Sequence, residues 1–270
     1  MAVAEIVTIG TELLLGEIQD TNSRYIARFL RDIGVDLYRL STVGDNVQRI
    51  TATLQEALMR ADIVITTGGL GPTVEYPTRQ AVAKTFNVPL EFHEELWEQI
   101  LERYKQYGQK PTENNKRQAY IPANSIPIPN PVGTAPAFAY ELGTKVVISL
   151  PGVPREMEYL IEHFVRDYLK RRYGLQETVI KPWVIHTISK GESTIDEIIG
   201  DLEELSNPTV GLLAHPGQTD IRVTAKAGSL AEAEQMMAPV LQRIREQLGK
   251  YIYGENETTL EEAVDQKQNY

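Results

Sequence analysis

Three stretches of the sequence combine glycine with hydroxyl, amide and acidic side chains, which together can hold phosphate groups. They are residues 10–22 (GTELLLGEIQDTN), 43–46 (VGDN) and 66–73 (TTGGLGPT). Glycine lets backbone N–H groups approach an anion closely, and a helix that opens near Thr78 would direct its positive end at the same place. The pattern favours a site for a nucleotide-like, phosphate-bearing ligand.

Four of the acidic residues in or next to these stretches are candidate ligands: Glu12, Asp20, Asp45 and Glu75. Carboxylate oxygens are the hard ligands that Mg²⁺ prefers in proteins, and such an ion commonly bridges phosphate groups. These side chains could therefore supply the ligands of a metal ion at the same site.

Each stretch also has a plain structural interpretation. Glycine after a strand is often only a tight turn, and Asp or Asn before a helix is often only a cap. Two later loops join the candidate site, residues 130–136 (NPVGTAP) and 150–156 (LPGVPRE), although the second also fits a simple passage from strand to helix. A site is favoured because the first three stretches are expected at one sheet edge, and ligands bind outside the carboxyl ends of parallel strands.

Alternating strand and helix patterns predict the sheet that would bring these stretches together. Strand patterns at 4–10, 35–43 and 62–67 alternate with helix patterns at 22–33 and 46–60. A βαβαβ order of this kind builds a parallel sheet with right-handed connections. The expected fold class is therefore α/β with a parallel sheet.

The rest of the chain predicts a second, smaller domain. We expect helices near 78–86, 93–107 and 154–173, a proline-punctuated stretch at 122–136, and a hairpin of 137–141 with 145–150 around Gly143. After Gly174 we expect strands at 179–188, 209–214, 220–227 and 251–253, with helices at 194–205 and 230–248. These patterns place an α/β domain at 1–174, a small α+β domain at 175–254 and a polar tail at 255–270.

Several enzyme classes are disfavoured by motifs that the sequence lacks. No G-x-G-x-x-G follows the first strand pattern, and neither G-x-x-x-x-G-K-[ST] nor G-x-S-x-G occurs. The four histidines are not spaced as metal ligands, and we interpret each as a surface or packing residue: His93, His163, His186 and His215.

The composition points to a cytoplasmic protein and away from nucleic acid and membranes. Asp and Glu number 37 against 27 Lys and Arg, the net charge is −10, and there is no Cys. Such a chain lacks the basic face that duplex phosphates require, and the lack of Cys agrees with a reducing compartment. No apolar run reaches the ~20 residues of a membrane-spanning helix, and the chain opens directly into a strand pattern without a secretory signal.

Taken together and in order, the motifs resemble those of the CinA family (competence/damage-inducible protein). The matching stretches are IGTELLLGEIQDTNS at 9–23, VGDN at 43–46, TGGLGPT at 67–73, NPVGTAP at 130–136, LPGVPREM at 150–157, KGES at 190–193, NPT at 207–209 and RVTAKA at 222–227. The resemblance runs from about residue 4 to 260. It implies a first domain like the molybdopterin-binding fold of MoaB and MogA proteins, and a small second domain described as KH-like. Because 175–254 contains no G-x-x-G loop, the KH label does not imply RNA binding.

The resemblance also implies an activity and a set of site residues. In the family, the N-terminal unit is associated with divalent-metal-dependent hydrolysis of the pyrophosphate in ADP-ribose and similar nucleotides. The expected cofactor is Mg²⁺ or a similar divalent ion, with room for a monovalent cation beside it, and the expected assembly is a homodimer. Asp20, Asp45 and Glu75 would hold the metal and act in catalysis. The ligand would contact Gly10, Thr11, Glu12, Asn22, Gly68, Gly69, Leu70, Gly71, Thr73, Thr78, Asn130, Gly133, Thr134, Pro151 and Gly152.

Two departures from the family pattern qualify this expectation. The chain ends at Tyr270, where a deamidase domain often begins, so no deamidase activity is expected. The family usually has two adjacent aspartates after G-L-G-P-T and one further residue, whereas this chain has Glu75 and Tyr76. A slow enzyme and a non-catalytic nucleotide- or pterin-binding module are therefore both open, and Tyr76 could instead pack over the loop or stack on an adenine.

Overall fold

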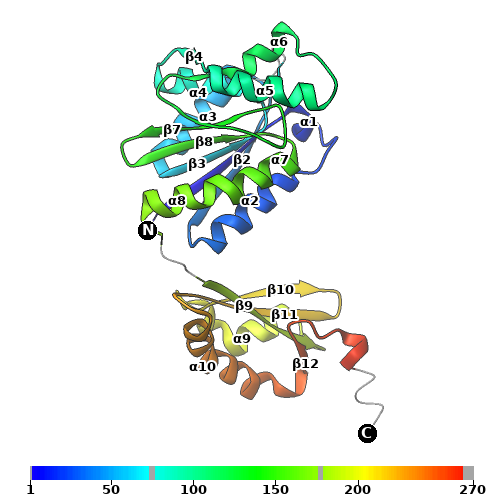
Figure 1. The fold of residues 1–270 in the computed structure, drawn as a ribbon. Coiled ribbons are helices and arrows are strands. Elements are labelled where there is room, and N and C mark those ends of the chain that lie inside the picture. The colour runs from blue at the N-terminus through cyan, green and yellow to red at the C-terminus, as the bar shows by residue number, and fades with distance from the viewer. Residues whose placement is uncertain (1, 73–76, 176–178, 264–270) are drawn as a thin grey trace. The chain divides into compact units, whose positions relative to one another are not determined.

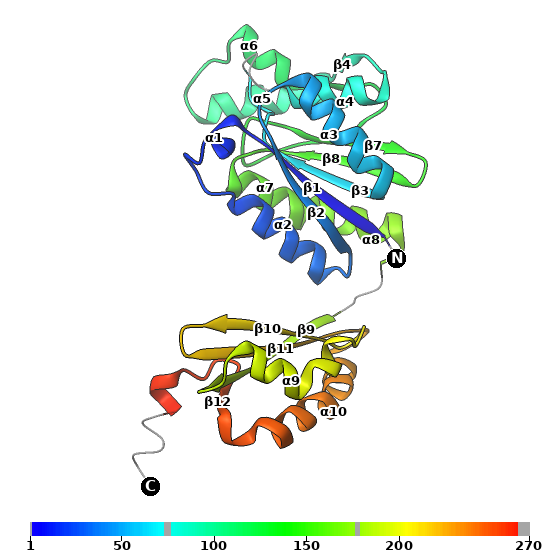
Figure 2. The same ribbon diagram turned by 180° about the vertical axis from the view of Figure 1, so that it is seen from behind.

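The computed structural model describes residues 2–72, 77–175 and 179–263. The chain divides into two compact units, residues 1–175 and 176–270. Figure 1 shows both units, and Figure 2 shows them from behind. No helix within the described residues is long and apolar enough to cross a membrane.

A six-stranded sheet forms the centre of the first unit, in the order β2-β1-β3-β8-β7-β6. Strand β1 pairs in parallel with β2 and β3, and β3 pairs in parallel with β8, whereas β7 runs antiparallel to β8 and β6. The four parallel strands therefore end at the same edge. The strands span Val3–Ile9 (β1), Asp36–Val43 (β2), Ile63–Thr67 (β3), Ile126–Ile128 (β6), Ala137–Leu142 (β7) and Lys145–Leu150 (β8).

Helices cover both faces of this sheet (Figure 1). Successive residues of a strand point to opposite faces, so Ile6 packs in one core with α2, α7 and α8, and Val7 packs in the other with α3, α4 and α5. This double burial explains why apolar residues of β1 and β3 point to both faces of the sheet. The helices span Thr21–Asp32 (α2), Val47–Arg60 (α3), Thr78–Phe86 (α4), Glu94–Gln106 (α5), Pro154–Leu160 (α7) and Arg166–Tyr173 (α8), and the π-helical turn Ile161–Val165 joins the last two.

The predicted α/β fold class is confirmed, and five short elements are additions to it. The proline-punctuated stretch contains strands β5 (Tyr120–Pro122) and β6, and β5 pairs with β4 (Leu90–Phe92) in a separate two-stranded sheet. Pro127 can sit in β6 because this strand lies at the sheet edge, where one side needs no partner. Helices α1 (Thr11–Leu14) and α6 (Glu113–Lys116) are single turns that leave no periodic pattern to detect.

The second unit is a four-stranded antiparallel sheet, in the order β10-β11-β9-β12, with two helices on one face. Every second residue of β11, from Thr219 to Ala227, is buried, which is the alternation of a sheet with one covered face. The elements span Val179–Ile188 (β9), Glu192–Glu203 (α9), Thr209–His215 (β10), Gln218–Ala227 (β11), Leu230–Leu248 (α10) and Ile252–Glu255 (β12). The predicted small α+β domain thus has the expected elements, with ends shifted by at most two residues.

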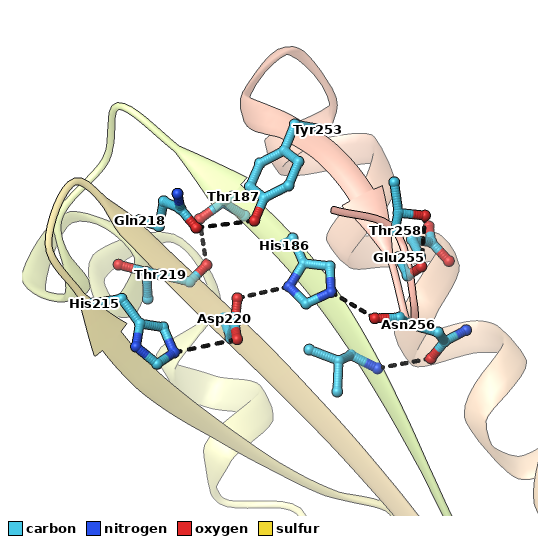
Figure 3. A network of polar contacts seen from close by, with 11 residues as sticks. His186, Thr187, His215, Gln218, Thr219, Asp220, Tyr253, Glu255, Asn256 and Thr258 are labelled. Carbon is cyan, nitrogen blue, oxygen red and sulfur yellow. Dashed lines mark hydrogen bonds and ion pairs between the residues drawn. The ribbon is translucent and has the colours of Figure 1, made fainter. Parts of the chain in front are cut away.

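A polar network centred on His186 joins β12 to the rest of the second unit (Figure 3). The His186 Nδ1 atom lies 2.7 Å from a carboxylate oxygen of Asp220, its direct partner on β11, and Nε2 lies 2.8 Å from the Asn256 carbonyl oxygen. His215 lies 3.4 Å from the other Asp220 oxygen, and the Tyr253 ring stacks on His186. Because both ring nitrogens face oxygens that can only accept, the doubly protonated imidazolium satisfies both contacts. Burial lowers the pKa of His186, but the bonds to Asn256 and Asp220 outweigh it and raise this pKa above its usual value.

Replacement of His186 should therefore cost more stability in acid than in base. A folded-state pKa above the unfolded value gives stability that is complete below the unfolded pKa, near 6.5, and is lost as the pH rises through the folded pKa. For His186→Gln we expect the loss in unfolding free energy to be about 1–2 kcal/mol larger at pH 5.5 than at pH 8.5, the scale of a hydrogen bond to a charged group. Urea unfolding at both pH values measures it, with the exposed His163→Gln of the first unit as control. An equal loss at both pH values would show that the imidazolium has no special role.

Candidate functional site

A cavity of about 610 Å³ opens at the edge where the parallel strands end. This volume lies in the ordinary range for small-molecule sites. Its walls come from the segment after β1, the loop after β3 and the loop after β8. The predicted site residues that line it are Glu12, Asp20, Asn22, Asp45, Gly68, Gly69, Leu70, Gly71, Thr134, Pro151 and Gly152.

Five of the remaining predicted residues are described but do not line the cavity. Gly10, Thr11, Thr78, Asn130 and Gly133 instead make contacts that shape the loops. Thr73 and Glu75, like Tyr76, lie outside the described residues.

The loop after β3 has a backbone that only glycine can follow. Gly68 and Gly69 have φ angles of 102° and 65°. A Cβ atom on Gly68 would lie 2.1 Å from the Ile9 carbonyl oxygen, and one on Gly69 would lie 2.1 Å from the Thr78 hydroxyl oxygen. Both distances are far below contact, so the two glycines are required by space as well as by conformation.

The carbonyl oxygens of this loop are occupied by groups at the start of α4. The Thr78 hydroxyl donates to the Gly68 oxygen (2.9 Å) and the Thr78 N–H donates to the Gly69 oxygen (3.3 Å). Arg79 donates to the Leu70 oxygen (2.8 Å). Within the described part of the chain, the N–H groups of Gly69, Leu70 and Gly71 meet no acceptor. They remain available to an anion, as in other glycine-rich phosphate loops.

Arg79 is a buried cation beneath this loop, only 5% exposed. Burial lowers the pKa of its guanidinium to about 9. Among the described residues it forms no ion pair, and its recorded bonds go to the Leu70 and Gly71 carbonyls. Its positive charge therefore lies directly behind the free N–H groups.

Asn22, at the start of α2, ties two strand ends together at the cavity. Its side-chain amide donates to the Thr67 hydroxyl and to the Gly152 carbonyl, both at 2.9 Å. The Thr67 hydroxyl in turn donates to the Pro151 carbonyl (3.0 Å). The start of α2 and the loops after β3 and β8 are thereby fixed to one another.

Asp20 and Asp45 line the cavity and also brace their own segments. Asp20 caps α2 by accepting from the Ser23 N–H and hydroxyl, at 2.9 and 2.5 Å. One oxygen of Asp45 accepts from the N–H and the hydroxyl of Thr11, at 2.7 and 2.9 Å. Each carboxylate keeps further lone pairs, so bracing does not prevent a second contact.

Several lining residues were not singled out by the sequence analysis, and Thr67, Gln118 and Glu156 are among them. Glu156 could have been found from the sequence, because it ends the 150–156 stretch that is assigned to the candidate site. Acidic residues in the first three stretches are considered as ligands, and the same reasoning applies to Glu156. Gln118 belongs to the 3₁₀ turn Arg117–Ala119, far from the motifs, and no sequence signal marks it.

The described lining residues carry acidic side chains and no basic ones. The carboxylates are those of Glu12, Asp20, Asp45 and Glu156, and neither Lys, Arg nor His is among the described lining residues. An anionic ligand at this place therefore needs a cation to offset the carboxylates.

The carboxylates of the cavity could hold a divalent ion only if a bound phosphate-bearing molecule supplied further oxygen atoms. No three His, Asp or Glu side chains in the described ranges are close enough to hold a metal ion by themselves. Mg²⁺, however, is usually held by one or two carboxylates together with phosphate oxygens and water. Asp20 and Asp45 meet this lower requirement.

A side chain at Gly68 should destabilise the protein well beyond the cost of its positive φ. We expect Gly68→Ala to lower the free energy of unfolding by about 3 kcal/mol or more, since the clash is with a backbone oxygen that cannot move aside. Gly143→Ala is the matched control, because Gly143 also has a positive φ of 57° but has open space around its missing Cβ. It should cost only about 1 kcal/mol. Equal costs for both variants in chemical unfolding would contradict the tight approach at Gly68.

Comparisons with known proteins agree with this architecture. Residues 5–171 match the family model of the probable molybdopterin binding domain, and residues 183–254 match that of the damage-inducible protein CinA KH domain. A competence-damage inducible protein of Halothermothrix orenii is 42% identical over 262 residues, which are 97% of this chain and 63% of that protein. This chain thus spans less than two thirds of the length of that relative.

Two solved structures each resemble part of this chain. The CinA protein of Thermoplasma acidophilum, whose function is given as unknown, has 38% identity and a TM-score of 0.57 over 62% of this chain and 97% of its own. The molybdopterin biosynthesis enzyme MoaB of Thermus thermophilus has 20% identity and a TM-score of 0.43 over 64% of this chain and 98% of its own. With both of its domains matched in order, the chain belongs to the CinA family.

Proposed function

We propose that the first unit is a divalent-metal-dependent pyrophosphatase that acts on ADP-ribose or a related nucleotide. One observation carries the proposal: glycine-loop residues whose N–H groups meet no acceptor in the described part of the chain line the same strand-end cavity as four acidic side chains. N–H groups on a glycine loop suit phosphate oxygens, and carboxylates suit the cations that accompany phosphates. A ligand that combines a diphosphate with divalent ions satisfies both.

The roles follow from the positions of the groups. The N–H groups of Gly69, Leu70 and Gly71 would hold the diphosphate, with the charge of Arg79 behind them. Asp20 and Asp45, with Glu75, would hold the divalent ion. When bound, such an ion neutralises phosphate charge and makes water a better nucleophile. The remaining volume of the cavity would take the nucleoside and the second sugar.

A non-catalytic nucleotide- or pterin-binding module is the second candidate function. It is favoured by Tyr76, which stands where the family usually has an acid, and by the lack of three converging carboxylates among the described residues. Both candidates predict binding, and only the first predicts turnover.

We propose further that the chain is cytoplasmic and forms a homodimer, without nucleic acid or membrane as a partner. The lack of cysteine agrees with a reducing compartment. Light scattering at micromolar concentration tests the dimer.

Divalent ions should be required for both binding and hydrolysis of ADP-ribose. With Mg²⁺ or Mn²⁺ and an added phosphatase, we expect phosphate release; with EDTA we expect none, and at least a tenfold weaker affinity in calorimetry. Asp45→Asn should need more metal for the same effect, whereas Glu158→Gln, on the same unit but outside the cavity, should not. Binding without release under any ion would favour the non-catalytic module, and binding that is unchanged by EDTA would remove the metal from the proposal.

Tyr76 should limit the rate of ADP-ribose hydrolysis. A phenol with an ordinary pKa near 10 is neutral at pH 7 and is a poor ligand for Mg²⁺, and loss of one catalytic acid typically costs about 10²–10⁴ in rate. We expect Tyr76→Asp to raise the turnover of ADP-ribose and Tyr76→Phe to leave it unchanged. Steady-state kinetics of the three proteins decides this. Equal turnover in all three would show that Glu75 and the other acids suffice.

A further inference from the structure

Glu156 is an acid of the cavity that has no place in the proposed metal site. It lies in the first turn of α7 and lines the cavity. The described lining residues of this cavity include no Lys, Arg or His. Asp20 and Asp45 each brace a neighbouring segment, and buried Glu5 is paired with Arg60 at 2.8 Å. Within the described ranges, Glu156 forms no ion pair with Lys or Arg. Its charge is therefore not fixed by a counter-ion.

The position of the Glu156 carboxylate is nevertheless tightly set. One of its oxygens accepts from the Asn130 side-chain amide at 2.6 Å. A Cβ atom on Gly133 would lie 2.0–2.4 Å from the three carboxyl atoms, so the carboxylate fills the space that a side chain there would need. The carboxylate thus packs directly against the backbone of the 130–135 loop.

Asn130 is itself held by a second helix. Gln99 of α5 accepts from the Asn130 N–H (2.7 Å) and donates to the Asn130 carbonyl (2.6 Å). Arg103, one turn further along α5, donates to the Val132 carbonyl (2.9 Å). Two helices and one loop thereby fix a single carboxyl group at the cavity wall, which is the preorganisation that a reacting group needs.

The surroundings also place Glu156 where it can exchange a proton. Burial raises the pKa of its carboxyl group, and the Asn130 amide, Arg103, the Ala135 backbone and Arg155 offset this only in part. A carboxyl group whose pKa moves toward the working pH is a better acid–base catalyst than an ordinary one.

We propose that Glu156 is the general base of the cavity, a catalytic residue additional to the acids that would hold metal. Its carboxylate takes one proton from the water whose oxygen forms a bond to a phosphorus of the bound diphosphate. The bridging P–O bond breaks, its electron pair stays on the leaving phosphate oxygen, and the proton on Glu156 is then released to solvent or to that oxygen. For ADP-ribose and one water the products are AMP and ribose 5-phosphate. This role rests on the proposed pyrophosphatase function.

The test compares Glu156→Gln with Glu158→Gln, which removes the same charge from the same helix outside the cavity. The glutamine oxygen can still accept from Asn130, so the loop should keep its place. With ADP-ribose and Mg²⁺, we expect kcat of the Glu156→Gln protein to fall about 10²–10⁴-fold, with KM within about threefold. The acid limb of its kcat–pH profile should disappear. Glu156→Asp should keep that limb and lose less activity, and Glu158→Gln should match the unaltered protein.

The outcomes separate this role from a structural one and from the function itself. Unchanged kcat and pH profile in Glu156→Gln would overturn the assignment. So would a loss confined to KM, or a reduced kcat with the acid limb intact, since a loop brace would give either result. Without turnover in the unaltered protein and in Tyr76→Asp, the pyrophosphatase proposal fails and the role of Glu156 falls with it. Turnover that is insensitive to Glu156→Gln removes Glu156 alone.

Discussion

The first unit depends on the close approach of backbone to backbone where its parallel strands end. Gly68 lies against the carbonyl of Ile9. Gly152 lies near Gly68, and a Cβ atom added to Gly152 would be 3.3 Å from the Gly68 Cα atom. The loops after three strands can meet only because these positions carry no side chains. The Asn22 amide then fixes the loops with two hydrogen bonds, and the cavity is what remains in front of them.

Charges of opposite sign lie on the two sides of the glycine loop. Acidic side chains face the cavity, whereas the buried guanidinium of Arg79 lies behind the glycine loop and binds its carbonyl groups. The loop carbonyls are held by α4, and the N–H groups of Gly69, Leu70 and Gly71 meet no acceptor among the described residues. An anion is thus favoured at the loop itself and disfavoured elsewhere in the cavity, unless cations accompany it.

Some of the polar residues that were predicted to contact a ligand hold loops in place instead. Thr78 and Asn130 are fully buried, and their hydrogen bonds go to the backbone or to other side chains of the protein. Buried polar groups of this kind are costly unless paired, so their pairing makes the loops rigid. The cavity is lined instead by backbone groups of the loops, by carboxylates and by a few neutral polar side chains such as Asn22 and Gln118.

The sequence by itself determined the α/β class, the order of the elements and the stretches that meet at one sheet edge. It could do so because periodicity reveals buried faces, and because carboxyl ends of parallel strands share an edge. Only the tertiary structure decided which residues of those stretches face the cavity. Asn130 and Thr78 turn inward, whereas Glu156 reaches the cavity with the help of Gln99 from a helix more than fifty residues earlier. Side-chain direction in irregular loops depends on such distant partners, and no local pattern records them.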